Sequence, residues 1–129
     1  MSSPASPSEA PLVLVAEADP ALRDALKFAL ELTGFRVETF DAVPALLQRR
    51  LPERGACLVL NQSLPNTSGL DGVVQLRRRG SRLPAVVLVG QTSPLLLRAA
   101  AAAGATVVEM PLVDGALEAA IRQALAAAG

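Results

Sequence analysis

The sequence predicts a single α/β domain built from five successive strand–helix units. Short apolar runs of five or six residues alternate with segments whose apolar residues recur at helical spacing. Glycines and helix-capping residues stand at most of the boundaries between the two kinds of segment. A chain of 129 residues, of which 51% are hydrophobic, is large enough to enclose one core.

The first unit joins a buried strand to an amphipathic helix. Residues 12–16 are continuously apolar, which is typical of a central parallel strand covered on both faces. Asp19 and the proline after it predict an N-cap and a first helical turn, and Gly34 is placed to end the helix after residues 20–33. The apolar face of this helix is expected to comprise Leu22, Ala25, Leu26 and Ala29.

The second and third units follow the same plan. Residues 35–40 alternate between apolar and polar, a pattern that predicts a half-exposed edge strand. Asp41 is expected to cap a short helix that extends to about Leu51. A second buried strand is predicted at residues 56–60, and a third helix at about residues 69–79.

The last two units complete the pattern. A buried strand is expected at residues 84–89, and Ser93 with the following proline predicts the start of a helix that ends at Gly104. A short strand at residues 106–110 precedes a final helix, which Asp114 is expected to cap. The apolar stripe of the final helix is predicted to comprise Leu117, Ala120, Ile121, Ala124 and Leu125.

Five such units require a parallel sheet with helices on both faces, because crossover connections are right-handed. Open sheets of this kind place their working site at the carboxyl ends of the strands. The chemistry of the chain is therefore sought in residues 17–19, 61–66, 89–92 and 109–112.

The composition excludes several classes of function. Twelve basic residues balance twelve acidic ones, whereas nucleic-acid binding needs a basic excess, so this domain is expected to bind no nucleic acid. The basic run at residues 77–79 is interpreted as the solvated end of a helix. The chain has no histidine, tyrosine or tryptophan, which argues against an enzyme. No metal ion and no other cofactor is expected.

The cysteine content and the length of the apolar runs indicate the cellular compartment in which the chain is expected. Cys57 is the single cysteine, so no internal disulfide is possible and a small buried residue in a reducing compartment is expected. No apolar run is long enough to span a bilayer. We therefore expect a cytoplasmic protein without a membrane partner, with a disordered leader at residues 1–10 and one domain at residues 11–129.

Several segments resemble the receiver domain of bacterial two-component response regulators. Residues 12–23 are similar to the opening strand, acidic cluster and first helix of that family, and residues 64–70, LPNTSGL, are similar to the loop after its third strand. Residues 102–105 and 109–112 match two further family segments, so the resemblance covers about residues 12–127. It implies a flavodoxin-like, doubly wound sheet of five parallel strands with five helices, (βα)5.

The resemblance also implies where a phosphorylation site would lie. The family uses an aspartate acceptor, two Mg²⁺-binding acids, a hydroxyl, a lysine and an aromatic switch residue. Here the acceptor position is Asn61, whose neutral amide is far less nucleophilic than a carboxylate. The acid positions carry Glu17 and Ala18, the hydroxyl position Val89, the lysine position Met110 and the aromatic position Val107.

These departures predict a degenerate pseudo-receiver, which regulates through protein contacts without being phosphorylated. The amide of Asn61 is expected to form a hydrogen bond within its loop and to hold one conformation. Two alternatives stay open: a receiver phosphorylated conventionally or in an unusual way through Glu17 and another acceptor, and a small-ligand binder or small enzyme on the same fold. The chain is compatible both with a stand-alone protein and with the N-terminal part of a longer regulator.

The helix that begins near Ser93 is the expected contact surface. Three consecutive leucines cover about 200° of its circumference, so they cannot all face the core. Exposed apolar area of this kind typically marks an interface, and the family uses the face of the fourth helix, fifth strand and fifth helix for dimerisation and partner binding. A protein partner, a homodimer or both are expected there, with candidate residues Leu95, Leu96, Leu97, Arg98 and Val107.

Overall fold

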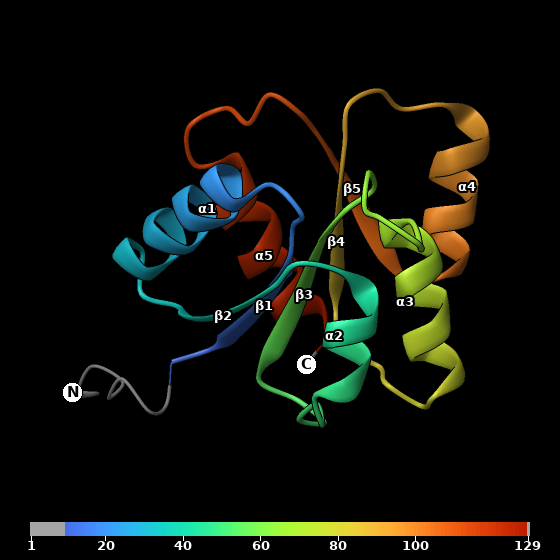
Figure 1. Cartoon of the computed structure of the whole chain (residues 1–129), viewed down its shortest axis with the longest axis horizontal. Coiled ribbons are helices and arrows are strands. Elements are labelled where there is room, and N and C mark those ends of the chain that lie inside the picture. Colours follow the sequence, from blue (N-terminus) through green and yellow to red (C-terminus); the bar gives the residue numbers. More distant parts are fainter. Residues whose placement is uncertain (1–9, 129) are drawn as a thin grey trace.

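A computed structural model describes residues 10–128 of the chain. The leader predicted at residues 1–10 lies almost entirely outside the described residues. Strands and helices alternate along the whole described part (Figure 1). In order, the elements are β1 (Leu12–Ala16), α1 (Pro20–Leu32), β2 (Arg36–Phe40), α2 (Val43–Gln48), β3 (Ala56–Asn61), α3 (Gly69–Arg78), β4 (Ala85–Val89), α4 (Pro94–Ala102), β5 (Ala105–Glu109) and α5 (Ala116–Ala127).

The strands form one parallel sheet in the order β2-β1-β3-β4-β5. This order confirms the predicted doubly wound α/β fold. Helices α2, α3 and α4 cover one face of the sheet, and α1 with α5 covers the other (Figure 1). The central strands β1 and β4 are buried along their full length, which explains why their sequences are continuously apolar.

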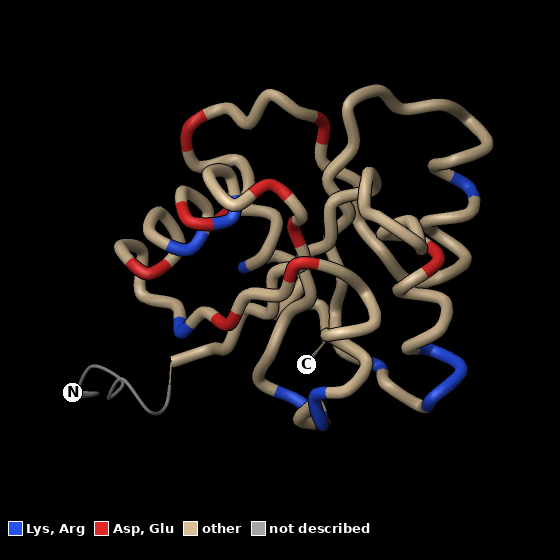
Figure 2. The backbone as a smooth tube through the Cα atoms, viewed as in Figure 1, with Lys and Arg blue, Asp and Glu red and all other residues tan. Residues whose placement is uncertain are grey.

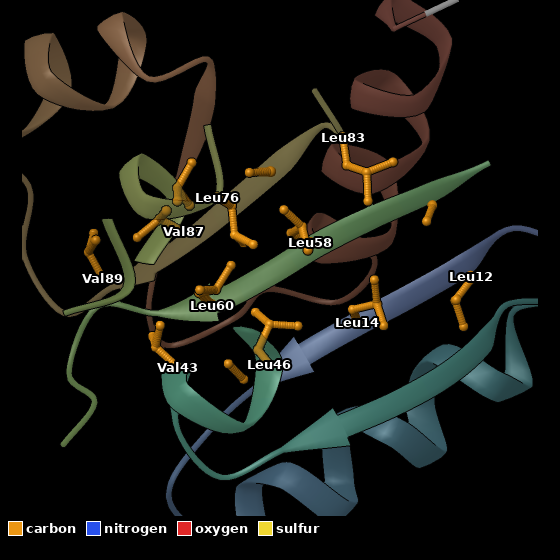
Figure 3. Packing of buried hydrophobic residues seen from close by; sticks show 14 residues of the cluster. Leu12, Leu14, Val43, Leu46, Leu58, Leu60, Leu76, Leu83, Val87 and Val89 are labelled. Carbon is orange, nitrogen blue, oxygen red and sulfur yellow. The ribbon is translucent and has the colours of Figure 1, made fainter. Parts of the chain in front are cut away.

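Each face of the sheet has its own core, because successive strand residues point to opposite sides. Figure 3 shows the core beneath α2, α3 and α4, where Leu14, Leu58, Leu60 and Val87 of the strands meet helix residues such as Leu46. The second core lies beneath α1 and α5 and includes Val15, Val59, Leu26 and Ile121. With few aromatic side chains available, both cores consist largely of leucine, valine and alanine.

Two predicted helix caps are correct and two are wrong. Asp19 accepts a hydrogen bond from the Ala21 amide at 3.0 Å, and Ser93 accepts one from the Leu96 amide at 3.1 Å. Asp41 does not cap α2, because Ala42 occupies the N-cap and Pro44 fixes the first turn. That helix also ends at Gln48, three residues before the expected end.

The start of α5 is also different from the prediction. Asp114 is exposed, and Gly115 occupies the N-cap position with a φ of 77°. This left-handed backbone conformation suits glycine, since it has no Cβ, and the helix begins without a side-chain cap. Leu117 and Ile121 are buried as expected, with Ala120, Ala124 and Leu125 packed around them at half exposure.

Helix α1 is rotated relative to its expected apolar face. Leu26 and Leu30 are its buried residues, with Leu22 packed beside them, whereas Ala25 and Ala29 are exposed. The core therefore receives the row of large side chains at four-residue spacing, because leucines fill the space beside the sheet better than alanines do.

The arginine run at the end of α3 is more than a solvated helix end. Arg77 is half-buried and donates hydrogen bonds to the carbonyls of Ala103, Gly104, Ser81 and Leu83 at 2.7–3.2 Å. It thereby ties the end of α3 to the end of α4 and to the segment before β4. The two arginines after it are exposed, so the prediction holds for them alone.

Cys57 is fully buried in β3, as predicted for a structural residue. Burial raises the pKa of the Cys57 thiol to about 12, because the thiolate would lie in an apolar environment. Within residues 10–128, no helix has both the length and the apolar character needed to cross a membrane.

Candidate functional site

The carboxyl ends of four neighbouring strands bring the predicted site residues to one edge of the sheet. Glu17 follows β1, Asn61 ends β3, Val89 ends β4 and Met110 follows β5. Because the strands are ordered β1-β3-β4-β5 across this part of the sheet, these residues stand in succession along the edge.

Glu17 is the buried carboxylate of this edge, with an exposed fraction of 3%. One of its oxygens accepts a hydrogen bond from the side-chain amide of Asn61 at 2.6 Å, and the other accepts one from the Asp19 amide at 3.1 Å. Arg23 donates to the Glu17 carbonyl at 2.9 Å. The burial of this charged group is tolerated because both of its oxygens have donors.

Asn61 is held in one orientation by partners at both ends of its amide. Its Nδ2 donates to Glu17, while its Oδ1 accepts a hydrogen bond from the Ser63 amide at 3.0 Å. The second bond confirms the expected hydrogen bond within the loop. A donor and an acceptor are required in these positions, and an asparagine side chain supplies both.

The loop after Asn61 closes tightly against α3. The Gly69 amide donates to the Gln62 carbonyl at 3.3 Å, and the side chain of Gln62 accepts from the Leu70 amide at 2.8 Å. A Cβ on Gly69 would lie only 2.5 Å from the Asn61 carbonyl oxygen. Glycine is therefore required here by close approach of the backbone.

The backbones of Val89 and Met110 are hydrogen-bonded neighbours, but their side chains point to opposite faces of the sheet. The Met110 amide donates to the Val89 carbonyl at 2.7 Å. Val89 is buried in the core beneath α2, α3 and α4 (Figure 3), whereas Met110 packs against the core beneath α1 and α5. The Met110–Pro111 bond, which the sequence leaves undecided, is cis. The four positions thus share an edge, while the direct side-chain contact joins Glu17 and Asn61 alone.

The comparison with protein-family models assigns the fold to a family. The model described as response regulator receiver domain matches residues 13–122. The chain belongs to this family. Receiver domains act in two-component signal transduction as signalling domains, and they interact with other proteins.

Individual relatives agree with this assignment. The transcriptional regulatory protein FixJ of Azorhizobium caulinodans is 32% identical over 114 residues, which cover 88% of this chain and 54% of that protein. The structure of the response regulator StyR is 35% identical with a TM-score of 0.83, covering 92% of this chain and 60% of that one. The chain therefore spans little more than half the length of these relatives.

A third comparison bears on the fold alone. The chemotaxis protein CheY4 of Vibrio cholerae is 21% identical, and its structure superposes with a TM-score of 0.79 over 90% of this chain and 99% of that one. Such a match at low identity confirms the flavodoxin-like arrangement of five parallel strands and five helices.

Two further residues that the sequence assigns to the site, Ala18 and Val107, lie shortly after β1 and within β5. Ala18 is half-buried beside Glu17, and its carbonyl accepts a long hydrogen bond from Arg23 at 3.4 Å. Val107 lies in the middle of β5 and packs against the core beneath α2, α3 and α4. Among residues 10–128, no three acidic, cysteine or histidine side chains gather in a way that could hold a metal ion.

Helix α4 exposes part of its leucine run. Leu95 is 72% exposed and Leu97 46% exposed, whereas Leu96 is half-buried and packs against the core. Arg98 is exposed, and it is the one charged residue within α4. The candidate interface therefore divides: Leu95, Leu97 and Arg98 lie outside, and Leu96 with Val107 faces inward.

Several polar residues that build the carboxyl edge received no role from the sequence, although most of them lie within the segments where the chemistry was sought. Gln62 and Ser63 hold the loop after β3, and the Thr92 amide and hydroxyl both donate to the Glu109 carboxylate, at 3.3 and 3.4 Å. Arg23 lies outside the apolar face predicted for α1, but its side chain reaches back to the Glu17 carbonyl. No local pattern distinguishes these polar residues from solvated ones, since their partners lie on other elements.

Replacing Gly69 with alanine tests the close approach at the loop. We expect Gly69→Ala to lower the free energy of unfolding by about 1–3 kcal/mol, because the new Cβ meets the Asn61 backbone oxygen. Urea denaturation measures the change. The matched control is Gly90→Ala, where a Cβ has no neighbour within 4 Å and the stability should change by less than about 0.5 kcal/mol. Equal effects of the two substitutions would contradict the geometry.

Replacing Asn61 with aspartate tests the contact with Glu17. At neutral pH we expect Asn61→Asp to lower the free energy of unfolding by about 2 kcal/mol, because an acceptor replaces the donor beside a buried carboxylate. The like charge raises the pKa of the new carboxyl in the folded state above its unfolded value of about 3.9. The deficit should therefore be absent below pH 4 and grow as the pH rises through the raised pKa.

Urea denaturation over a series of pH values measures this dependence. Asn66→Asp is the control, because Asn66 is exposed in the same loop with a φ of 71°, a conformation that aspartate also adopts. A deficit in Asn61→Asp that does not change with pH would show that the two side chains are not coupled.

Proposed function

We propose that this receiver domain is a pseudo-receiver, a regulatory module that works through protein contacts and is not phosphorylated. It is proposed to act in the cytoplasm and to have no enzymatic activity. The observation that carries the proposal is the 2.6 Å hydrogen bond from the Asn61 amide to the buried Glu17 carboxylate. It gives the carboxyl edge a single carboxylate held by hydrogen bonds, in place of a reactive cluster of acids.

The chemistry of Asn61 supports this proposal. In a phosphoryl transfer to a receiver, a carboxylate oxygen attacks phosphorus and becomes part of an acyl phosphate. An amide oxygen is a much weaker nucleophile, and the Asn61 oxygen already accepts the Ser63 amide. The Asn61 nitrogen points at Glu17 and donates a hydrogen bond to its carboxylate. Neither amide atom is therefore suited to receive a phosphoryl group.

The residues present do not fit the Mg²⁺ ion that the family uses. This ion requires several oxygen ligands in a nearly octahedral arrangement. Both oxygens of Glu17 accept N–H hydrogen bonds, the side chain of its neighbour Ala18 has no ligand atom, and the Asn61 amide nitrogen faces the carboxylate as a donor. A cation at that place would have to displace the hydrogen bond and would find one charged ligand.

The two remaining positions also support a silent site. Val89 offers no hydroxyl and is buried among apolar side chains. Met110 carries no charge and packs toward the α1 and α5 side of the sheet. Stabilisation of a transferred phosphoryl group needs donors at these places, and neither residue has one. The contact between Glu17 and Asn61 then holds the edge in one conformation without a ligand.

The proposed output surface is the face of α4, β5 and α5. Leu95 and Leu97 are exposed on α4, and large exposed apolar side chains close together are typical of a contact surface. The partner is proposed to be a protein, either another copy of this chain or a different one. Because no switch is needed at the carboxyl edge, this surface would be available permanently.

Incubation with acetyl phosphate and Mg²⁺ tests the absence of phosphorylation. We expect the intact mass of the chain to stay unchanged, because the acceptor position carries the amide of Asn61 and not a carboxylate. A phosphorylatable receiver domain treated in parallel is the positive control. A phosphoryl adduct on the native chain would overturn the proposal, and peptide mapping would then identify the acceptor.

Light scattering on α4 variants tests the output surface. We expect the native chain to self-associate and the double variant Leu95→Glu, Leu97→Glu to be monomeric, because charges would enter an apolar contact. Leu32→Glu is the control, since Leu32 is 70% exposed but lies on α1. Leu96 is unsuitable for substitution because it packs against the core. A monomeric native chain would exclude a homodimer and leave a different protein as the partner.

A further inference from the structure

The charges of the chain are separated between the two ends of the sheet. Arginines gather where the α2–β3 and α3–β4 loops lead into the amino ends of β3 and β4, in the lower part of Figure 2. Within residues 49–55 and 78–82, Glu53 is the one acidic side chain. The six arginines there are Arg49, Arg50, Arg54, Arg78, Arg79 and Arg82. A nearly neutral chain therefore has a strongly basic amino edge.

A hollow of about 510 Å³ opens among these arginines. We call it the amino-edge groove and define it by the six arginines and leucines among its lining residues. Three of them are basic and three are apolar: Arg49, Arg79 and Arg82 with Leu47, Leu51 and Leu76. The leucines are buried or half-buried, so the groove combines apolar walls with guanidinium groups.

The three arginines of the groove differ in how far their guanidinium groups are already engaged by other residues of the chain. Arg49 forms an ion pair with Glu38 at 2.6 Å, which holds the pKa of the Glu38 carboxyl below its usual value. Arg79 is exposed and donates one N–H to the Leu47 carbonyl at 3.0 Å, which positions its guanidinium beside the groove with further donors left. Arg82 is exposed and also lines a second hollow, of about 560 Å³, together with Arg54.

We propose that the amino-edge groove binds an acidic segment of a partner protein, in which an apolar side chain is flanked by carboxylates. Guanidinium groups match carboxylates in charge and in bidentate geometry, and the leucine walls would receive the apolar side chain between them. A nucleic acid fits less well, because its phosphate backbone has no apolar group for these walls and the chain as a whole has no excess of positive charge. The site lies at the opposite end of the sheet from Asn61, so it is independent of the proposed pseudo-receiver function.

Peptide binding measured by fluorescence anisotropy tests the proposal. The probe is a short labelled peptide of sequence Glu-Glu-Leu-Glu-Glu, and the same peptide with glutamine in place of glutamate is the control. We expect the acidic peptide to bind at low ionic strength, to dissociate as salt is added and to bind more tightly than the glutamine peptide. Equal binding of the two peptides, or no binding, would overturn the proposal.

Two variants that change the charge of the groove in opposite directions test whether the peptide binds there. Arg82→Glu should weaken binding about tenfold or more, because a negative charge replaces a positive one and lowers the net charge of the groove by two units. Glu53→Gln should strengthen binding several-fold, because it removes the one acidic side chain that lines both hollows. Arg98→Glu makes the same charge change on α4 and should have little effect. Thermal unfolding of each variant shows that it is folded.

Three other results would overturn the assignment. Equal losses from Arg82→Glu and Arg98→Glu would mean that net charge and not the groove attracts the peptide. Tighter binding of a short DNA duplex than of the peptide, abolished by Arg82→Glu, would assign the groove to nucleic acid. Self-association that Arg82→Glu abolishes, without peptide binding, would assign it to the acidic residues of a second copy.

Discussion

The buried carboxylate of Glu17 is the constraint on which the carboxyl edge depends. A charged group with an exposed fraction of 3% must find hydrogen-bond donors within the protein, and the strand order supplies them. Because β1 and β3 are neighbours in the sheet, Asn61 at the end of β3 meets the residue that follows β1. The backbone turn into α1 provides the second donor through Asp19. The loop after β3 is then held by the other end of the Asn61 amide and by Gly69.

Under the proposed pseudo-receiver function, this hydrogen-bonded pair takes the place of a cation-dependent centre. In a pocket of carboxylates, repulsion must be offset by a metal ion or a basic side chain. Here the Asn61 side chain and the Asp19 backbone N–H together satisfy one carboxylate, and the neighbouring strand ends contribute the apolar residues Val89 and Met110. The proposed pseudo-receiver function therefore requires no change of conformation at this edge. The features that remain available for interaction are then on the surface, at the leucines of α4 and at the basic amino edge.

The sequence predicted the fold closely, because apolar runs and alternation reflect how each short segment is buried. Continuous apolar runs identified the central strands, and residues 35–40 were correctly read as an edge strand because they alternate. Errors were confined to details that depend on neighbours. Asp41 and Asp114 have the right chemistry for caps, but Pro44 and Gly115 set the helix starts one residue later. On α1, the buried face includes Leu30, whereas Ala25 and Ala29, which were expected there, are exposed.

The amino-acid sequence by itself determined the alternation of elements, the residue types at the strand ends and the excess of leucine on α4, because these follow from composition and periodicity. Only the tertiary structure decided which polar groups meet. The bond between Glu17 and Asn61, the reach of Arg77 to four carbonyls and the gathering of arginines from two separate loops all join residues distant in sequence. Their partners are selected by strand order and helix placement, and no local pattern in the chain encodes those distances.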